Sequence, residues 1–182
     1  MPYSYKPKGK AGKAQGHDIN ASFKDLSEVC RNIRGRNAYS ARDFLELAAK
    51  GERAIYFGTH NKHMGHRHEL GGRKGGWPVK SAKIVLGILE NAIANAEKNG
   101  ISTPIVKHAA ANKQDIYPRL APKGRRFKMD YETARVAIVL EEAILPKGAA
   151  PKAPVKKEAP KEARKQPVKQ EQKQAAPQKM TV

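Results

Sequence analysis

The sequence predicts an α+β domain, and three observations support this fold class. Three segments carry apolar residues at the spacing of one helix face. Two later segments, 105–117 and 132–142, have strand-like apolar patterns. A basic turn joins these two segments, so they are expected to form an antiparallel hairpin.

The first two helical segments have clear starts and stops. Ser22 or Asp25 stands near the start of the first helix, and Gly35 follows its end. Asn37 is the expected N-cap of the second helix, and Gly51 is the glycine that ends it. The apolar faces are Leu26, Val29, Cys30 and Ile33 in the first helix, and Ala41, Phe44, Leu45 and Ala48 in the second.

The third helix is the longest, at about residues 78–99, and its charges are in an unusual order. Lys80 and Lys83 stand in its first turns, whereas Glu90 and Glu97 come later. The helix dipole favours the opposite order. An anion docked at the start of the helix would favour the order seen here. Its expected buried stripe is Ala82, Val85, Leu86, Leu89, Ile93 and Ala96.

The hairpin is expected over about 108–136, with a short further strand at 18–23. The outer end of the hairpin has few apolar residues, so this end is expected to project from the body of the domain. Between the two strands lies a cluster of five cations with no acid before Asp130. The cluster consists of Arg119, Lys123, Arg125, Arg126 and Lys128. A solvated turn is the simpler interpretation, but this density of cations favours contact with phosphates.

Both ends of the chain differ from the middle in composition. Residues 1–16 carry four lysines and no acid, and we interpret them as a flexible basic arm. Residues 147–182 are rich in Lys, Ala, Pro and Gln, with ten basic and three acidic residues and no aromatic residue. Such a segment buries too little apolar surface to order itself, so we expect a disordered tail. The globular domain is therefore expected at 17–146.

The charge and cysteine content restrict the class of protein. Among 182 residues, 36 Lys and Arg face 17 Asp and Glu, for a net charge of +19. This excess repels itself in a compact chain and is typical of a protein with a polyanionic partner. Cys30 is the single cysteine, which rules out an internal disulfide and fits a reducing cytosol. No run approaches the ~18 apolar residues of a membrane span.

The segment 59–78 raises the question of a metal site, because it holds four closely spaced histidines. These are His60, His63, His66 and His68. Their spacing suits zinc, but structural zinc sites mostly use Cys, and Lys62 and Arg67 would repel a cation. A solvated polar loop is a second alternative. The favoured interpretation is a polyanion-binding loop, in which glycines allow close approach to phosphates and histidines bond sugar or base edges.

Catalytic chemistry has little support in the sequence. No nucleophile-elbow pattern and no phosphate-cradling GxxxxGK[ST] motif is present. We therefore expect no enzyme activity, no catalytic residue and no cofactor. Trp77 is expected either to stack on a base or to belong to the core.

Several motifs carry a resemblance to a known family. In chain order they are YSYKP (3–7), SFK (22–24), IRG (33–35), GTHNKHMGH (58–66), GGWPVKSAKIVLGILENAIANAE (75–97), IVKHAAANK (105–113), YPR (117–119) and VAIVLEE (136–142). Over roughly residues 3–145 the chain resembles the archaeal and eukaryotic branch of the universal large-subunit ribosomal protein twenty-two family, called seventeen in eukaryotes. The tip after Pro118 and Arg119 departs from the common family pattern P-R-A-x-G-R.

The resemblance implies both a fold and a function. The implied fold is a small antiparallel three-stranded sheet packed with three helices, with one long projecting hairpin. The implied function is structural: such a protein binds large-subunit ribosomal RNA, joins its domains during assembly and lines the nascent-peptide exit tunnel with its hairpin. The expected partners are that RNA, neighbouring large-subunit proteins and the nascent polypeptide, in the cytoplasm and without a membrane.

The residues expected to contact RNA lie in the histidine loop, the start of the third helix and the hairpin. They are Lys62, His63, His66, Arg67, Arg73, Lys74, Trp77, Lys80, Lys83, Lys113, Arg119, Lys123, Arg125, Arg126 and Lys128. Two other classes stay open. A general nucleic-acid-binding or chromatin-like protein would bind duplex DNA as well as ribosomal RNA. A zinc-dependent regulator would need stoichiometric metal.

Overall fold

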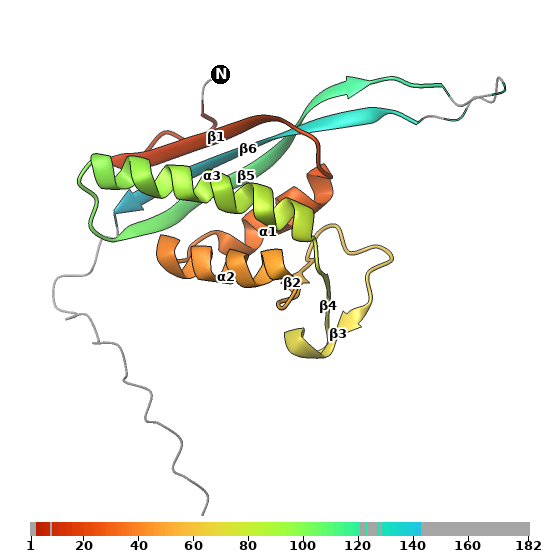
Figure 1. Cartoon of the computed structure of the whole chain (residues 1–182), viewed down its shortest axis with the longest axis horizontal. Coiled ribbons are helices and arrows are strands. Elements are labelled where there is room, and N and C mark those ends of the chain that lie inside the picture. Colours follow the sequence, from red (N-terminus) through yellow and green to blue (C-terminus); the bar gives the residue numbers. More distant parts are fainter. Residues whose placement is uncertain (1–2, 8, 121–122, 124–126, 128, 143–182) are drawn as a thin grey trace, which may run out of the picture. The chain divides into compact units, whose positions relative to one another are not determined.

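The computed structural model describes residues 3–7, 9–120, 123, 127 and 129–142 (Figure 1). The chain divides into a compact unit, Met1–Leu145, and a second unit, Pro146–Val182. The predicted tail at 147–182 lies outside the described residues. No helix of the described part is long and apolar enough to cross a membrane.

The main sheet has three antiparallel strands, and the last strand of the described residues lies in its middle. The strands are β1 (Ala11–Ile19), β5 (Pro104–Tyr117) and β6 (Tyr131–Glu142), in the order β1-β6-β5. Ile138 of β6 lies opposite Ala14 of β1 on one side and Ala109 of β5 on the other. The predicted three-stranded antiparallel sheet is confirmed.

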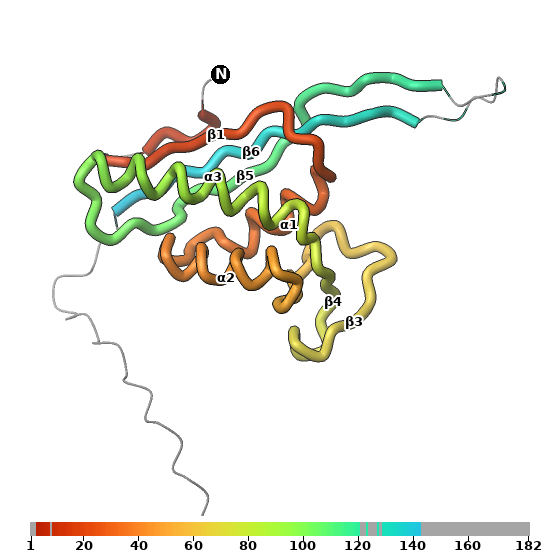
Figure 2. Tube along the Cα trace, viewed as in Figure 1, coloured from red at the N-terminus to blue at the C-terminus, as the bar shows by residue number. Residues whose placement is uncertain are grey.

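Three helices pack with this sheet, as predicted. They are α1 (Phe23–Ile33), α2 (Ala38–Lys50) and α3 (Val79–Lys98). In Figure 2, α3 lies along the sheet, where it contacts β1 and β6; α1 contacts β5, and α2 packs on α3. Fully buried side chains such as Leu26 of α1, Leu89 of α3 and Leu140 of β6 form the core between these layers. Leu86 of the predicted α3 stripe is only partly buried.

The helix ends follow the capping residues. The Ser22 hydroxyl accepts a hydrogen bond from the Asp25 N–H, and the Asn37 side chain accepts one from the Tyr39 N–H. Gly51 ends α2 in the left-handed conformation, with φ 84°, which glycine adopts without steric cost. Cys30 is buried in α1, and burial raises the pKa of its thiol to about 12 against the opposing charge of Arg34. This thiol is a core group and not a nucleophile.

The N-terminal region differs from the prediction. Residues 11–16, expected in a flexible arm, belong to β1, and the strand expected at 18–23 ends at Ile19. Phe23 is instead the first residue of α1. The segment before β1 is also held in place. The Tyr5 hydroxyl donates to a Glu141 carboxylate oxygen at 2.8 Å, and its ring stacks on His108 with centroids 5.4 Å apart.

Close packing of β1 on α3 explains why the strand was missed. Gly12 is buried, and a Cβ there would lie 2.5 Å from both the Ala92 carbonyl oxygen and the Ala96 Cβ. A Cβ at Gly16 would lie 2.7 Å from the end of the Ile88 side chain. Glycines therefore occupy strand positions where apolar residues would signal a buried face. The alternation that identifies a strand is lost.

The segment between α2 and α3 is folded, although the sequence indicated only a loop. It contains a second antiparallel sheet in the order β2-β4-β3 and a short 3₁₀ helix. The elements are β2 (Ile55–Tyr56), β3 (His66–Arg67), η1 (His68–Leu70) and β4 (Arg73–Gly76). Strands this short, with charged and glycine residues, carry no readable alternation.

The hairpin is confirmed over its described length. β5 and β6 remain paired as far as Tyr117 opposite Tyr131, and Figure 1 shows both strands extending beyond the helices. At its outer part the Met129 N–H donates to the Arg119 carbonyl oxygen at 3.2 Å.

We predict that Gly12→Ala destabilises the protein. The new methyl group would meet the backbone of α3, which cannot move aside without separating the helix from the sheet. Overpacking of this kind costs about 1–3 kcal/mol in the free energy of unfolding, as measured by urea denaturation.

Gly87→Ala is the matched control. Gly87 lies in α3 with nothing within 4 Å of its Cβ position, so alanine should raise the unfolding free energy by about 0.5–1 kcal/mol. Equal effects of the two substitutions would contradict the close packing of β1 on α3.

Candidate nucleic-acid interface

A buried carboxylate shapes the start of the histidine loop. Glu28 of α1 is 1% exposed, and its two oxygens accept hydrogen bonds from three consecutive backbone N–H groups. The donors are Gly58 at 2.9 Å and Thr59 and His60 at 2.8 Å each. Three N–H groups that point at one carboxylate cannot rearrange without leaving a buried charge unpaired. The loop is therefore fixed to α1.

The environment of Glu28 keeps it ionised. Burial raises the pKa of this carboxyl. The hydrogen bonds from His60, Gly58 and Thr59, together with the charge of Arg31, lower the pKa by more than burial raises it. The net result is a pKa below the usual value for Glu.

Two neighbours of Glu28 on α1 hold the same loop. The Arg31 guanidinium donates to the Thr59 hydroxyl, and the Asn32 amide donates to the Tyr56 carbonyl oxygen at 2.8 Å. A Cβ at Gly58 would lie 2.6 Å from the Arg31 guanidinium, so a larger residue there would require the end of this arginine side chain to shift. One face of α1 thus positions residues 56–60.

The four histidines of the loop lie in different environments and do not converge on one point. His60 packs edge-on against Phe23 with centroids 5.8 Å apart. His66 places Nδ1 2.6 Å from the Gly72 carbonyl oxygen, while His63 and His68 are exposed. Within the described residues, no three His, Cys, Asp or Glu side chains are grouped to hold a metal ion.

Arg67 and Trp77 form a pair at the end of this segment. The Arg67 Nε donates to the Gly75 carbonyl oxygen at 2.9 Å, and its guanidinium lies 4.4 Å from the centroid of the Trp77 ring. Trp77 is 40% exposed. Of the two alternatives for this residue, the core position is therefore wrong.

The predicted contact residues are largely on the surface. Those that are exposed are Lys62, His63, His66, Arg73, Trp77, Lys80, Lys83, Lys113, Arg119 and Lys123, whereas Arg67 and Lys74 are half-buried. Among the described members of the set, Lys113 alone is in a salt bridge, with Glu132 at 2.6 Å. Arg125, Arg126 and Lys128 lie outside the described residues.

The start of α3 lacks the usual compensation of its dipole. Its N-cap is Pro78, which makes no side-chain capping hydrogen bond, and its first turn contains no acid. The exposed Lys80 stands in the first turn instead, and the exposed Lys83 in the next. The partial positive charge of the helix end and the two ammonium groups therefore add together.

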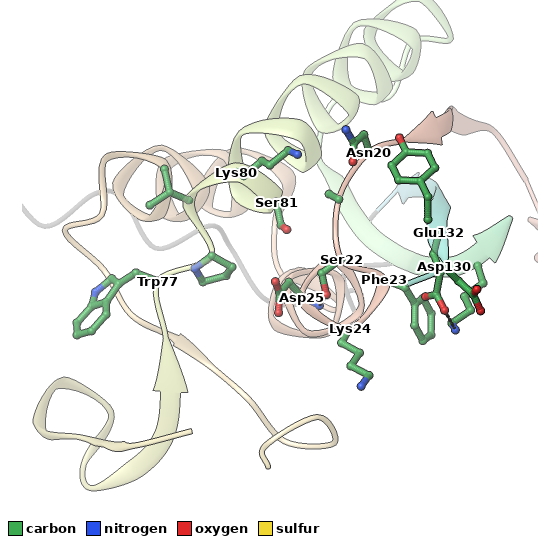
Figure 3. A pocket seen from close by; sticks show the side chains of 15 residues that line it. Asn20, Ser22, Phe23, Lys24, Asp25, Trp77, Lys80, Ser81, Asp130 and Glu132 are labelled. Carbon is green, nitrogen blue, oxygen red and sulfur yellow. Dashed lines mark hydrogen bonds and ion pairs between the residues drawn. The ribbon is translucent and has the colours of Figure 1, made fainter. Parts of the chain in front are cut away.

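A cleft of about 740 Å³ separates the start of α3 from the start of α1. Figure 3 shows Ser22, the N-cap of α1, and Asp25 of α1 facing Ser81 of α3, with Lys24 and Lys80 at the margins. Among the residues that line this cleft, the predicted RNA contacts are Trp77, Lys80 and Lys113. The cleft arises from the crossing of two helices, which no local pattern reveals.

Known proteins resemble this chain over most of the compact unit described above. Residues 14–141 match the family model described as ribosomal protein L22p/L17e. The large ribosomal subunit protein uL22 of Methanosphaera stadtmanae is 39% identical over 148 residues, which cover 78% of this chain and 96% of the relative. The uL22 protein of Archaeoglobus fulgidus is 38% identical over 146 residues, 76% of this chain and 94% of the relative.

The chain belongs to the ribosomal protein L22p/L17e family. The predicted family and its archaeal branch are thereby confirmed. An L22p/L17e protein is a structural component of the large ribosomal subunit and not an enzyme. The matched region includes the histidine loop, α3 and both hairpin strands.

We predict that Glu28→Gln destabilises this L22p/L17e protein. A glutamine amide keeps one acceptor oxygen but turns an NH₂ group toward backbone N–H donors. The loss of charged hydrogen bonds should lower the unfolding free energy by about 2–3 kcal/mol at pH 7. Because the folded pKa of Glu28 is depressed, its stabilisation exists above the unfolded pKa and is lost as pH falls through the folded pKa. The difference between wild type and variant should therefore shrink in acid.

Glu46→Gln is the control for this measurement. Glu46 lies on the surface of α2 and pairs with Arg42 at 3.6 Å, with 47% of its own side chain exposed. Its loss should change the unfolding free energy by less than about 0.5 kcal/mol. If Glu28→Gln were as mild as this control at pH 7, the loop would not depend on the carboxylate.

Proposed function

We propose that this protein binds large-subunit ribosomal RNA and joins separate segments of it during assembly. The proteins that it resembles are named as large ribosomal subunit proteins, which supports this partner. The observation that carries the proposal is the set of exposed cations that lack acidic partners in the described structure. A surface of this kind binds the phosphate backbone by releasing counterions.

The distribution of these cations favours contact with several RNA segments. Lys62 and Arg73 belong to the folded segment between α2 and α3, Lys80 and Lys83 to the start of α3, and Arg119 to the hairpin. The core packing connects α3 with the hairpin strands, and the hydrogen bonds to Glu28 attach residues 58–60 to α1. RNA segments that bind to these elements are therefore brought together on one domain.

The hairpin is proposed to line the nascent-peptide exit tunnel. Its support is the exposure of apolar side chains at the outer end: Leu120 is 86% exposed and Phe127 66% exposed. Side chains of this type gain from an apolar contact that the domain itself does not provide. A nascent polypeptide in the tunnel is the proposed partner, beside ribosomal RNA and neighbouring large-subunit proteins.

The proposed RNA-binding domain remains 17–146 with the hairpin, although the structural unit that supports it also includes β1 from Ala11. The ribosome, a cytoplasmic particle, is its proposed location. A chromatin-like protein is the alternative, and it would bind duplex DNA with the same affinity as ribosomal RNA.

Replacing Lys80 and Lys83 together with alanine should weaken RNA binding without harming the fold. The slope of log affinity against log salt concentration should fall by about 1.5–2 units, because two phosphate contacts are lost. The free energy of unfolding should rise by a few tenths of a kcal/mol or more, since unfavourable charges leave the start of α3. Filter binding to a large-subunit RNA transcript and urea unfolding measure the two effects.

Lys98→Ala is the control within the same helix. Lys98 stands in the last turn of α3, where a cation suits the dipole, so its loss should slightly lower stability and leave the salt slope almost unchanged. Equal salt slopes for the wild type and the double variant would remove the start of α3 from the RNA interface.

A photo-crosslinking residue in place of Leu120 tests the tunnel assignment. In ribosomes that carry a stalled, labelled nascent chain, this position should crosslink to the polypeptide. Leu47, 37% exposed on α2, is the control position and should not crosslink to it. Crosslinks from position 120 to RNA alone would contradict the contact with the nascent chain.

A further inference from the structure

The cleft between the starts of α1 and α3 contains a polar group that the structure leaves without a partner. Ser81 is 2% exposed, yet its hydroxyl forms no hydrogen bond among the described residues. Figure 3 shows this side chain directed toward Ser22 and Asp25 across the cleft. The hydroxyl lies at the open cleft and is not an enclosed group, so a ligand that enters the cleft can bond to it in place of water.

The opposite wall of the cleft is acidic. The Asp25 carboxylate is half-buried, and burial raises its pKa, whereas the Ser22 hydroxyl and the charges of His60 and Lys24 lower it. A phosphate placed against this carboxylate would be repelled. The group that enters between Asp25 and Ser81 must instead offer a hydrogen-bond donor to the carboxylate and a polar atom to the hydroxyl.

The charges at the margins of the cleft differ from side to side. Lys24 stands on the α1 side and Lys80 on the α3 side, whereas Asp130 and Glu132 line the hairpin side. The first turn of α1 already contains Asp25, whereas the first turn of α3 contains no acid. A phosphate therefore fits at the α3 margin, next to Lys80, and not between Asp25 and Ser81.

We propose that this cleft binds one unpaired ribonucleotide, with its base edge between Asp25 and Ser81 and its phosphate beside Lys80. A base edge carries adjacent donors and acceptors, which match a carboxylate and a hydroxyl, and proteins read unpaired RNA bases through such contacts. The volume of about 740 Å³ is in the range of small-ligand sites and accommodates a nucleotide. The proposal rests on the proposed binding of large-subunit RNA and specifies what that RNA places in this cleft.

The cationic α3 side of the cleft favours RNA over a peptide from a neighbouring protein. Lys80 and the dipole of α3 have no acid in the first turn of that helix, and Lys83 follows one turn later, whereas the acids Asp130 and Glu132 lie on the hairpin side. A peptide would need its own acidic residues to meet these charges, whereas each nucleotide carries a phosphate.

The test uses the full chain and a large-subunit RNA transcript. Base reactivity is probed with dimethyl sulfate at A and C and with a carbodiimide at U and G. Wild type should protect one unpaired nucleotide that regains reactivity with Ser81→Ala. The same variant should bind about three- to tenfold more weakly, as expected for one lost hydrogen bond, with an unchanged salt slope because no charge is removed.

Ser81→Ala is expected to fold normally, because alanine is the better helix former and the hydroxyl has no protein partner. Asp25→Asn is a second variant and should expose the same nucleotide. Ser40→Ala, at an exposed position of α2, is the matched control and should bind like wild type. Urea unfolding of each variant separates lost binding from lost structure.

The outcomes distinguish this proposal from the proposed function. If the wild type fails to prefer the large-subunit transcript over unrelated RNA, the proposed function itself fails. If the wild type binds but Ser81→Ala and Asp25→Asn keep its affinity and protections, the nucleotide site is overturned. The site is also overturned if Ser81→Ala leaves RNA binding intact and instead weakens the attachment of another large-subunit protein.

Discussion

Glu28 is the point on which the arrangement of the basic surface depends. Its carboxylate is the acceptor for three successive N–H groups, and it lies on the helix that also contacts β5 of the main sheet. Together with the hydrogen bonds of Arg31 and Asn32, this carboxylate attaches the start of the histidine loop to the core. The attachment is electrostatic and local. A buried carboxylate requires hydrogen-bond donors nearby, and the backbone N–H groups of residues 58–60 provide them.

Aromatic rings help the described domain to tolerate its excess of cations. Arg67 lies over Trp77, Arg73 over Tyr56 and Arg119 over Tyr131. Such contacts orient a guanidinium while leaving its N–H groups able to bind another anion. Mutual repulsion is thus tolerated in the free protein and would be relieved when an RNA partner is bound.

The sequence predicted the elements with strong local signals and missed those determined by tertiary packing. The caps at Asn37 and Gly51, the long α3 and the hairpin strands were found because each has its own residue pattern. β1 was not predicted because α3 lies so close to it that glycines, Gly12 and Gly16, occupy positions where apolar side chains would indicate a strand. The roles of Glu28 and Ser81 were not visible, because both depend on neighbours more than twenty residues away in the chain.

The two long strands have a mechanical consequence for the hairpin. β6 is at once the central strand of the sheet and one arm of the projection, so the described part of the hairpin continues the core sheet as far as Tyr117 and Tyr131. Residues 136–140 are all buried, so a slip of one position would exchange the side chains on the two buried faces of β6. The smallest slip that returns each side chain to its own face is two residues, or roughly 7 Å at the rise of a strand. The distance that the hairpin projects from the domain can therefore change only in steps of about this size if its strands slip against the rest of the sheet.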